Sequence, residues 1–141
     1  MSADRPTLYG PELLALARSP RHVGVLRDPT HTERRDNPLC GDRVSLQLRV
    51  ADGRVCEVAH QTRGCALCVA SVSVLGDQVL GGSVADALGQ AHAVLSELSA
   101  SAEQPQSPGL QLFAGVRQAP ARAGCVALPW EALAKALDST G

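Results

Sequence analysis

One stretch of the sequence alternates strictly between apolar and polar residues, and this pattern constrains the fold more than any other feature. The apolar residues occupy every second position from Val44 to Val50, and polar residues fill the positions between them. Such alternation predicts a β-strand with one buried face. Asp52-Gly53 follows directly and is a strong signal for a tight hairpin turn, because both central residues of that turn adopt positive φ. The pattern therefore predicts an antiparallel hairpin whose second strand covers Arg54–His60.

Helices are expected after this hairpin. The segment Cys65–Leu80 is apolar almost all round, which predicts a buried, central helix. Gly81-Gly82 ends it. Ser83, with Asp86 three residues later, resembles a capping box and predicts a helix that continues to Leu98.

The remaining segments carry weaker signals. Residues 12–18 and residues 129–137 are expected to be helical, and residues 23–26 to form a short strand. Residues 27–36 show no periodicity and are expected to be irregular, whereas the Ser-, Gln- and Pro-rich residues 99–109 are expected to form a loop insertion. The 141 residues are expected to form one α+β domain, with a small antiparallel sheet packed on one face by helices.

Charge and hydropathy exclude several classes of protein. The formal charge is −1, with 13 basic and 14 acidic residues, so the chain lacks the basic surplus of a nucleic-acid-binding protein. No apolar run is long enough to cross a bilayer, so no membrane partner is expected. The first ten residues lack the basic head and apolar body of a secretory signal, which predicts a cytoplasmic protein.

The cysteines are the candidate functional residues. Structural disulfides are rare in the cytoplasm, and an odd number of cysteines argues further against a full disulfide framework. Metal binding or thiol chemistry is therefore the expected role of at least some of the five, which are Cys40, Cys56, Cys65, Cys68 and Cys125.

Three of these cysteines lie at junctions between irregular and regular segments. Cys65 and Cys125 each follow a glycine and stand near an expected helix start, where the partial positive charge favours a thiolate. Cys40 is followed by Gly41 and Asp42, which adds a carboxylate. If the junctions converge, three thiolates and one carboxylate suit tetrahedral Zn²⁺, and the same sulfur atoms also suit iron–sulfur chemistry.

The other two cysteines have simpler interpretations. Cys56 is expected to fill the strand face that it shares with Val58. Cys68 is expected to act as a small buried hydrophobe, and a spare ligand or a resolving thiol is the alternative. Cys65 and Cys68 together also match the spacing of a thioredoxin-like motif, so a thiol–disulfide oxidoreductase is an alternative function.

Three segments carry a resemblance to a known family: NPLCGD from Asn37, RGCALCVASVSVLGDQVLGG from Arg63, and ARAGCVALPWEALAKAL from Ala121. In this order they resemble the IscU/NifU family of iron–sulfur cluster assembly. Gly124 stands where IscU-type scaffolds usually carry a His, and Arg122 precedes Cys125 by three residues, so the chain is most similar to the SufU-type branch.

The resemblance implies a site and a function. It implies Zn²⁺ held by Cys40, Asp42, Cys65 and Cys125. It also implies that Cys40 receives persulfide sulfur from a SufS-type cysteine desulfurase, which would make the chain a zinc-dependent sulfurtransferase, with Arg122 stabilising the departing thiolate. Downstream iron–sulfur assembly proteins would be further partners.

Besides the thiol–disulfide oxidoreductase, two further alternatives to the sulfurtransferase remain at this stage. One is a scaffold that binds iron and assembles a transient [2Fe–2S] cluster at the same residues. The other is a zinc-stabilised structural domain.

Overall fold

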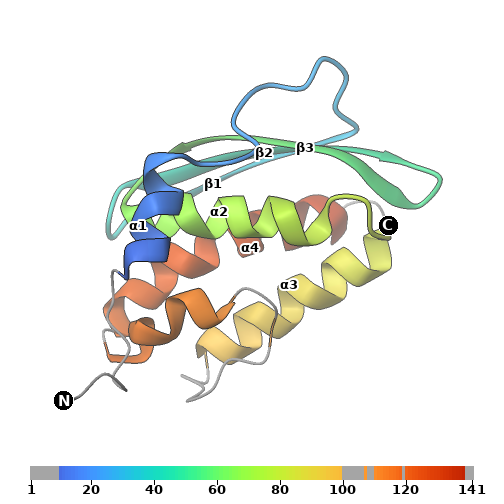
Figure 1. Cartoon of the computed structure of the whole chain (residues 1–141). Coiled ribbons are helices and arrows are strands. Elements are labelled where there is room, and N and C mark those ends of the chain that lie inside the picture. Colours follow the sequence, from blue (N-terminus) through green and yellow to red (C-terminus); the bar gives the residue numbers. More distant parts are fainter. Residues whose placement is uncertain (1–9, 100–106, 108–109, 119, 139–141) are drawn as a thin grey trace.

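A three-stranded antiparallel sheet, covered on one face by helices, forms the framework of the protein (Figure 1). The strands follow the order β1-β2-β3, where β1 is His31–Asn37, β2 is Asp42–Ala51 and β3 is Arg54–Arg63. This arrangement confirms the predicted α+β class. The computed structural model describes residues 10–99, 107, 110–118 and 120–138.

The hairpin of β2 and β3 forms where the alternation predicts it. Asp52 and Gly53 both have positive φ, 53° and 72°, as a tight hairpin turn requires. Val44, Leu46 and Leu48 have no exposed surface and face the helices. Because side chains two residues apart share a face of a strand, this row begins at Asp42, whose side chain is also buried.

A β-bulge in β3 overturns the expectation for Cys56. The pairing of β2 with β3 shifts register between Arg49 and Val50, and Cys56 becomes the extra residue on its strand. Cys56 is therefore exposed while Val58 is buried, so the prediction that they share a face is wrong.

Strand β1 lies within the segment that was expected to be irregular, so that prediction is also wrong. It is an edge strand, and its residues alternate between half-buried and exposed without a single apolar side chain. Apolar periodicity therefore gives no signal for it. Its pairing with β2, for example Arg35 opposite Val44, is a tertiary contact that local sequence does not reveal.

The predicted strand over residues 23–26 is absent from the described structure. Val23 makes only an isolated bridge to His60, and the Leu26 N–H donates to the side chain of Gln47 at 2.8 Å. The segment passes across the face of the sheet that lies away from the helices (Figure 1).

The predicted α-helices occur in the predicted order, and the structure adds 3₁₀ segments that the sequence did not predict. The elements of the helical layer are α1 (Pro11–Arg18), α2 (Ala66–Val79), α3 (Val84–Ser99), the 3₁₀ segments η1 (Leu110–Gln118) and η2 (Pro120–Arg122), and α4 (Ala123–Asp138). The Asp86 N–H donates to Ser83 Oγ at 3.0 Å, which confirms the predicted cap of α3. Helix α4 begins six residues before Pro129, so Pro129 lies inside the helix and not at its start. The loop insertion expected at residues 99–109 falls almost entirely outside the described residues.

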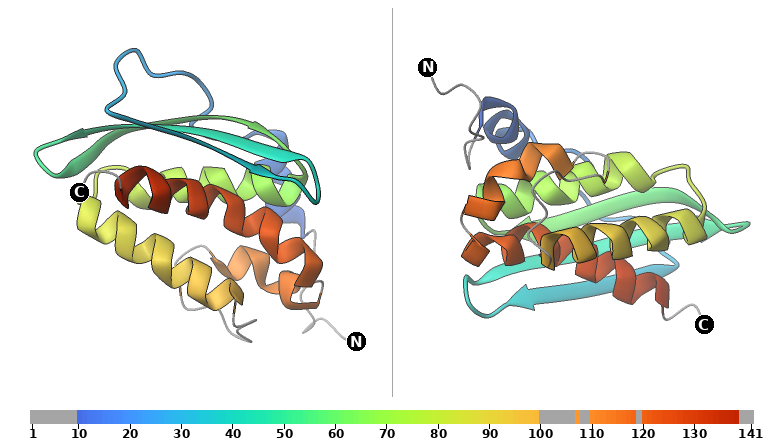
Figure 2. Two further views of the ribbon diagram at one scale, coloured as in Figure 1. Left: turned by 180° about the vertical axis from the view of Figure 1, so that it is seen from behind. Right: turned by 90° about the horizontal axis from the view of Figure 1, so that it is seen from below.

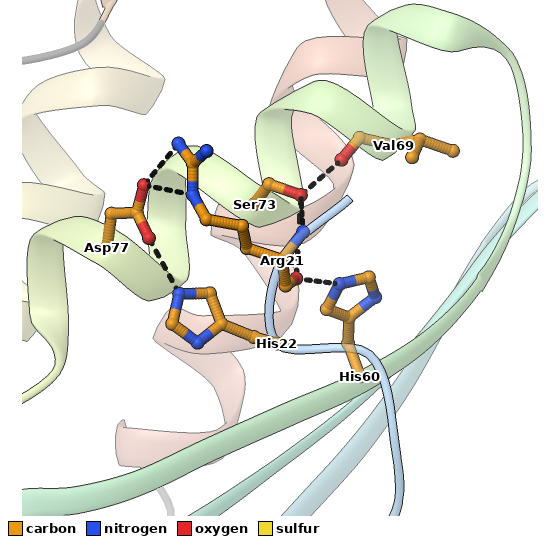
Figure 3. A network of polar contacts seen from close by, with 6 residues as sticks. All are labelled: Arg21, His22, His60, Val69, Ser73 and Asp77. Atoms are coloured by element: carbon orange, nitrogen blue, oxygen red, sulfur yellow. Dashed lines mark hydrogen bonds and ion pairs between the residues drawn. The ribbon is translucent and has the colours of Figure 1, made fainter. Parts of the chain in front are cut away.

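Hydrogen bonds and ion pairs join Arg21 and His22, in the segment after α1, to the C-terminal part of α2 (Figure 3). Asp77 on α2 accepts hydrogen bonds from the Arg21 guanidinium at 2.8 Å and lies 2.7 Å from His22 Nε2. His60 Nε2 donates to the Arg21 carbonyl at 2.8 Å, and Thr62 Oγ1 lies 2.8 Å from His60 Nδ1. This network connects the segment after α1 to α2 and β3.

The turn between β1 and β2 lies at the same end of the molecule as the first turns of α2 and α4 (Figure 2). The two helices pack side by side beneath the sheet, and almost every residue of α4 from Cys125 onward is buried. Among the described residues, no helix is long and apolar enough to cross a membrane.

Candidate metal centre

Cys40 lies in the turn that joins β1 to β2. The N–H groups of Cys40 and Gly41 both donate to the Asn37 carbonyl, at 3.3 and 2.8 Å. Gly41 has a φ of 74°, a left-handed conformation that glycine adopts without a steric penalty. This tight turn leaves the Cys40 side chain exposed to solvent.

Asp42 is the first residue of β2, and its side chain points from the sheet toward the helices. Only 3% of its surface is exposed. Its Oδ1 accepts the N–H of Cys65 at 3.3 Å, so the carboxylate lies against the N-terminus of α2, where a negative charge is favoured. The second oxygen, Oδ2, lies 3.9 Å from Cys65 Sγ.

The other two thiols come from helix N-termini. Cys65 is the N-cap residue of α2, with extended backbone angles, and its side chain is half-buried. Cys125 is in the first turn of α4, and only 1% of its surface is exposed. The packing of α2 beside α4 therefore brings both helix starts to the β1–β2 turn.

Three of the four side chains that the sequence predicts to converge, those of Cys40, Asp42 and Cys125, lie close together, and Cys65 lies just outside this group. Cys40 Sγ is 3.7 Å from Cys125 Sγ. One ligand atom each from Cys40, Asp42 and Cys125 can be chosen so that all lie within 4.8 Å of one another. Cys65 adjoins this group through its contacts with Asp42.

The distance between the Cys40 and Cys125 sulfurs fits a tetrahedral centre. Sulfur atoms bound about 2.3 Å from one zinc ion at tetrahedral angles are about 3.8 Å apart. The observed 3.7 Å between the Cys40 and Cys125 sulfurs agrees with this value. The donor set of three thiols and one carboxylate is also of the type that Zn²⁺ accepts, so the residues present fit the metal.

Burial and mutual repulsion disfavour bare negative charge at this site. Burial raises the pKa of the Cys125 thiol, and the neighbouring Cys65, Asp42 and Cys40 raise that pKa further. Burial raises the pKa of Cys68 in the same way, and Asp42, Cys65 and Cys40 add to the effect. A divalent cation reverses this balance, because it deprotonates a thiol that coordinates it.

Comparison with known families matches residues 8–139 of this chain to the NifU-like N-terminal domain. The chain belongs to this family. The match covers nearly the whole sequence and confirms the resemblance that the three cysteine segments carry.

Individual relatives agree with this assignment. This NifU-like domain is 34% identical to the iron–sulfur cluster assembly scaffold protein IscU of Streptococcus pyogenes serotype M1, over 86% of this chain and 77% of that protein. It is 32% identical to the zinc-dependent sulfurtransferase SufU of Bacillus subtilis (strain 168), over 95% of this chain and 92% of that protein.

A solved structure supports the fold. The crystal structure of a putative iron–sulfur cluster assembly scaffold protein for the SUF system from Fervidobacterium islandicum AW-1 superposes with a TM-score of 0.84. The sequences are 24% identical, and the match covers 92% of this NifU-like domain and 96% of that chain.

Arg122 and Cys68 are two further residues to which the sequence assigned possible roles at the site. Arg122 is half-buried at the end of η2, three residues before Cys125. Cys68 is in the first turn of α2 and has no exposed surface. Helix α2 follows an antiparallel hairpin and not a βαβ unit, which argues against the thioredoxin-like oxidoreductase alternative.

Two glycines shape this centre, and sequence reasoning noted both of them without predicting their steric role. A Cβ atom at Gly64 would lie 3.0 Å from the carboxylate of Asp42, so glycine lets this carboxylate approach α2 without being displaced. A Cβ at Gly124 would lie 3.1 Å from Asn37 Nδ2, which places the Cys40 turn against the start of α4. Both glycines precede a cysteine, and that repeated pairing was the available signal.

Proposed function

We propose that this protein serves iron–sulfur cluster assembly by accepting sulfur on Cys40 from a cysteine desulfurase, and that it binds Zn²⁺ through Cys40, Asp42, Cys65 and Cys125. The observation that carries the metal site is the 3.7 Å separation of the Cys40 and Cys125 sulfurs beside the buried carboxylate of Asp42. The relationship to a named zinc-dependent sulfurtransferase supports the same conclusion.

Exposure distinguishes Cys40 from the other thiols of the centre. It is exposed at the tip of the β1–β2 turn, whereas Cys65 is half-buried and Cys125 is buried. A persulfide carried on another protein can approach only a thiol at the surface. Cys40 is therefore the sulfur acceptor in this proposal.

The transfer step balances without any further reactant. The Cys40 thiolate attacks the terminal sulfur of the desulfurase persulfide, a new S–S bond forms on Cys40, and the desulfurase thiolate leaves. A bound zinc ion would keep the thiols deprotonated at neutral pH. We assign to Arg122 the role of stabilising the negative charge on the departing thiolate, because it stands immediately before the helix that carries Cys125.

The test uses anaerobically purified protein, with zinc and iron measured per chain before a SufS-type cysteine desulfurase and cysteine are added. The wild-type protein is expected to contain zinc and to accelerate alanine release. Cys40→Ala is expected to reduce alanine release to the rate of the desulfurase alone, because no exposed acceptor thiol remains at the site.

Cys56→Ala is the matched control, because Cys56 is exposed but lies on the bulge of β3 outside the centre. The Cys56→Ala protein should accelerate alanine release by the desulfurase as much as the wild type does. The proposal would be contradicted if the Cys40→Ala protein still accelerated alanine release.

A scaffold for a [2Fe–2S] cluster is the second candidate function, favoured by the similarity to proteins named as IscU scaffolds. It predicts uptake of iron and sulfide with visible absorption in the same assay. Tight zinc binding without any effect on the desulfurase would instead indicate a structural role.

A further inference from the structure

The structure assigns to Cys68 the role of a reserve metal ligand, which binds the ion in place of Cys40 when Cys40 is engaged in sulfur transfer. The inference rests on the proposed zinc site. It concerns a fifth sulfur that the four-residue site does not use.

The position of Cys68 on α2 is the first argument. Cys65 is the N-cap residue of this helix, and Cys68 is the third residue within it. Side chains at these two positions of a helix lie next to each other, which is the basis of the capping box. Two cysteines separated by two residues are also a common pair of ligands for a single zinc ion.

The surroundings of Gly64 are the second argument. A Cβ atom at Gly64 would lie 3.0 Å from Cγ of Asp42 and 3.2 Å from Cβ of Cys68. The carboxylate of Asp42 and the side chain of Cys68 thus lie against the same glycine. Cys68 is therefore next to a residue of the proposed coordination set, and not only next to Cys65 in sequence.

The third argument is that Cys40 and Cys68 differ in their exposure to solvent. Cys40 is exposed in the turn, whereas Cys68 is fully buried among core residues. A partner protein that engages Cys40 from outside leaves the buried Cys68 unchanged. A buried reserve ligand would keep three protein thiolates on the ion throughout the transfer.

The exchange conserves atoms and charge. Cys68 loses its thiol proton as its sulfur binds the ion, and Cys40 leaves as a thiolate. The proton passes to solvent or, when no persulfide is present, to Cys40. No oxidant or reductant is required.

Co²⁺ is a suitable probe for this inference, because the intensity of its thiolate charge-transfer absorption increases with the number of bound thiolates. We would compare wild type, Cys40→Ala, Cys68→Ser and Cys40→Ala/Cys68→Ser, with Cys56→Ser as the control for loss of an exposed thiol. Circular dichroism of each metal-free variant tests whether the fold is retained. Cys68→Val provides a second, apolar replacement if the serine variant does not fold.

Three thiolates are expected to bind Co²⁺ in the wild type and in each of the single variants Cys68→Ser, Cys40→Ala and Cys56→Ser. Only two are expected in the double variant. The double variant should also bind zinc at least ~10-fold more weakly than Cys40→Ala, since even residues behind the ligands typically contribute 10–100-fold to metal affinity. The affinity comparison requires no desulfurase.

Two results would overturn the inference alone: equal absorption and affinity in Cys40→Ala and the double variant, or loss of a thiolate in Cys68→Ser while Cys40 is intact. The second result would make Cys68 a permanent ligand. Absence of thiolate absorption in the wild type would overturn the proposed zinc site as well, so the two failures are distinguishable.

Discussion

Gly64 is the single residue that lies directly against the carboxylate of Asp42, a ligand in the proposed metal centre. An added Cβ at Gly64 would be 3.0 Å from both Cγ and Oδ1 of Asp42. Since real Cβ atoms rarely approach so closely, a side chain at this position must displace Asp42. Neither the motif nor the composition of the sequence reveals this contact.

Gly64→Ala is therefore expected to weaken zinc binding by about 10-fold, the lower end of the range for residues that position metal ligands. Competition with a chromophoric chelator measures the affinity. Gly82→Ala is the matched control, because its Cβ would meet only the Val79 carbonyl at an ordinary 3.5 Å. Equal affinities in the two variants would show that Asp42 does not depend on Gly64.

His60 makes stability depend on pH. It is 1% exposed, and burial lowers its pKa, although the Arg21 carbonyl opposes this effect (Figure 3). Because the folded pKa lies below the unfolded value of about 6.5, the unfolded chain takes up the proton first as the pH falls. The stabilisation is therefore complete above about pH 7 and is lost as the pH falls below about 6.5.

Urea unfolding of metal-free protein at pH 7.5 and pH 5.5 tests this prediction. The free energy of unfolding is expected to be lower by about 1 kcal/mol at the lower pH. In His60→Phe that difference should shrink, because the titrating group is gone. An unchanged difference in the variant would assign the pH dependence to other groups.

The β2–β3 turn is the element whose geometry the sequence specifies most directly. Gly53 has a φ of 72°, which costs about 1–2 kcal/mol for a residue with a Cβ. Its carbonyl also accepts the Val84 N–H at 2.8 Å, so the turn supports the start of α3.

Gly53→Ala is accordingly expected to lower the free energy of unfolding by about 1 kcal/mol. Gly89→Ala on the exposed side of α3 should raise it by about 0.5–1 kcal/mol, since alanine is the better helix former and its Cβ meets nothing within 4 Å. Chemical denaturation measures both. A Gly53→Ala protein as stable as the wild type would show that the turn tolerates another conformation.

The proposed metal centre links three parts of the whole molecule: the β1–β2 turn, the start of α2 and the start of α4. A ligand that binds only the folded chain stabilises it by mass action, by about 2.7 kcal/mol when its free concentration is 100 times Kd. Zinc is therefore expected to raise Tm by several degrees, and chelation to reverse the shift.

Differential scanning calorimetry with zinc, and with magnesium as the control, tests this expectation. Magnesium prefers hard oxygen ligands and should leave Tm unchanged. Cys125→Ala should reduce the zinc-dependent shift relative to Cys56→Ala, because Cys125 is in the centre and Cys56 is not. Equal shifts in the two variants would place the zinc elsewhere.

The sequence by itself determined the elements whose patterns are local. The hairpin, α2 and the cap of α3 follow from alternation, apolar content and a serine three residues before an acid, all of which act between near neighbours in the chain. The family resemblance followed from cysteines in fixed motifs, and it identified the candidate metal ligands.

Tertiary structure alone decided the rest. β1 is held by pairing with β2 and carries no apolar pattern, and the bulge at Cys56 reverses the face that strict alternation assigns to it. The approach of Cys40 to Cys125 depends on the packing of α4 beside α2, and Gly124 leaves room for Asn37 in the turn that carries Cys40. Such contacts join residues up to 85 positions apart, which no local preference of the chain can specify.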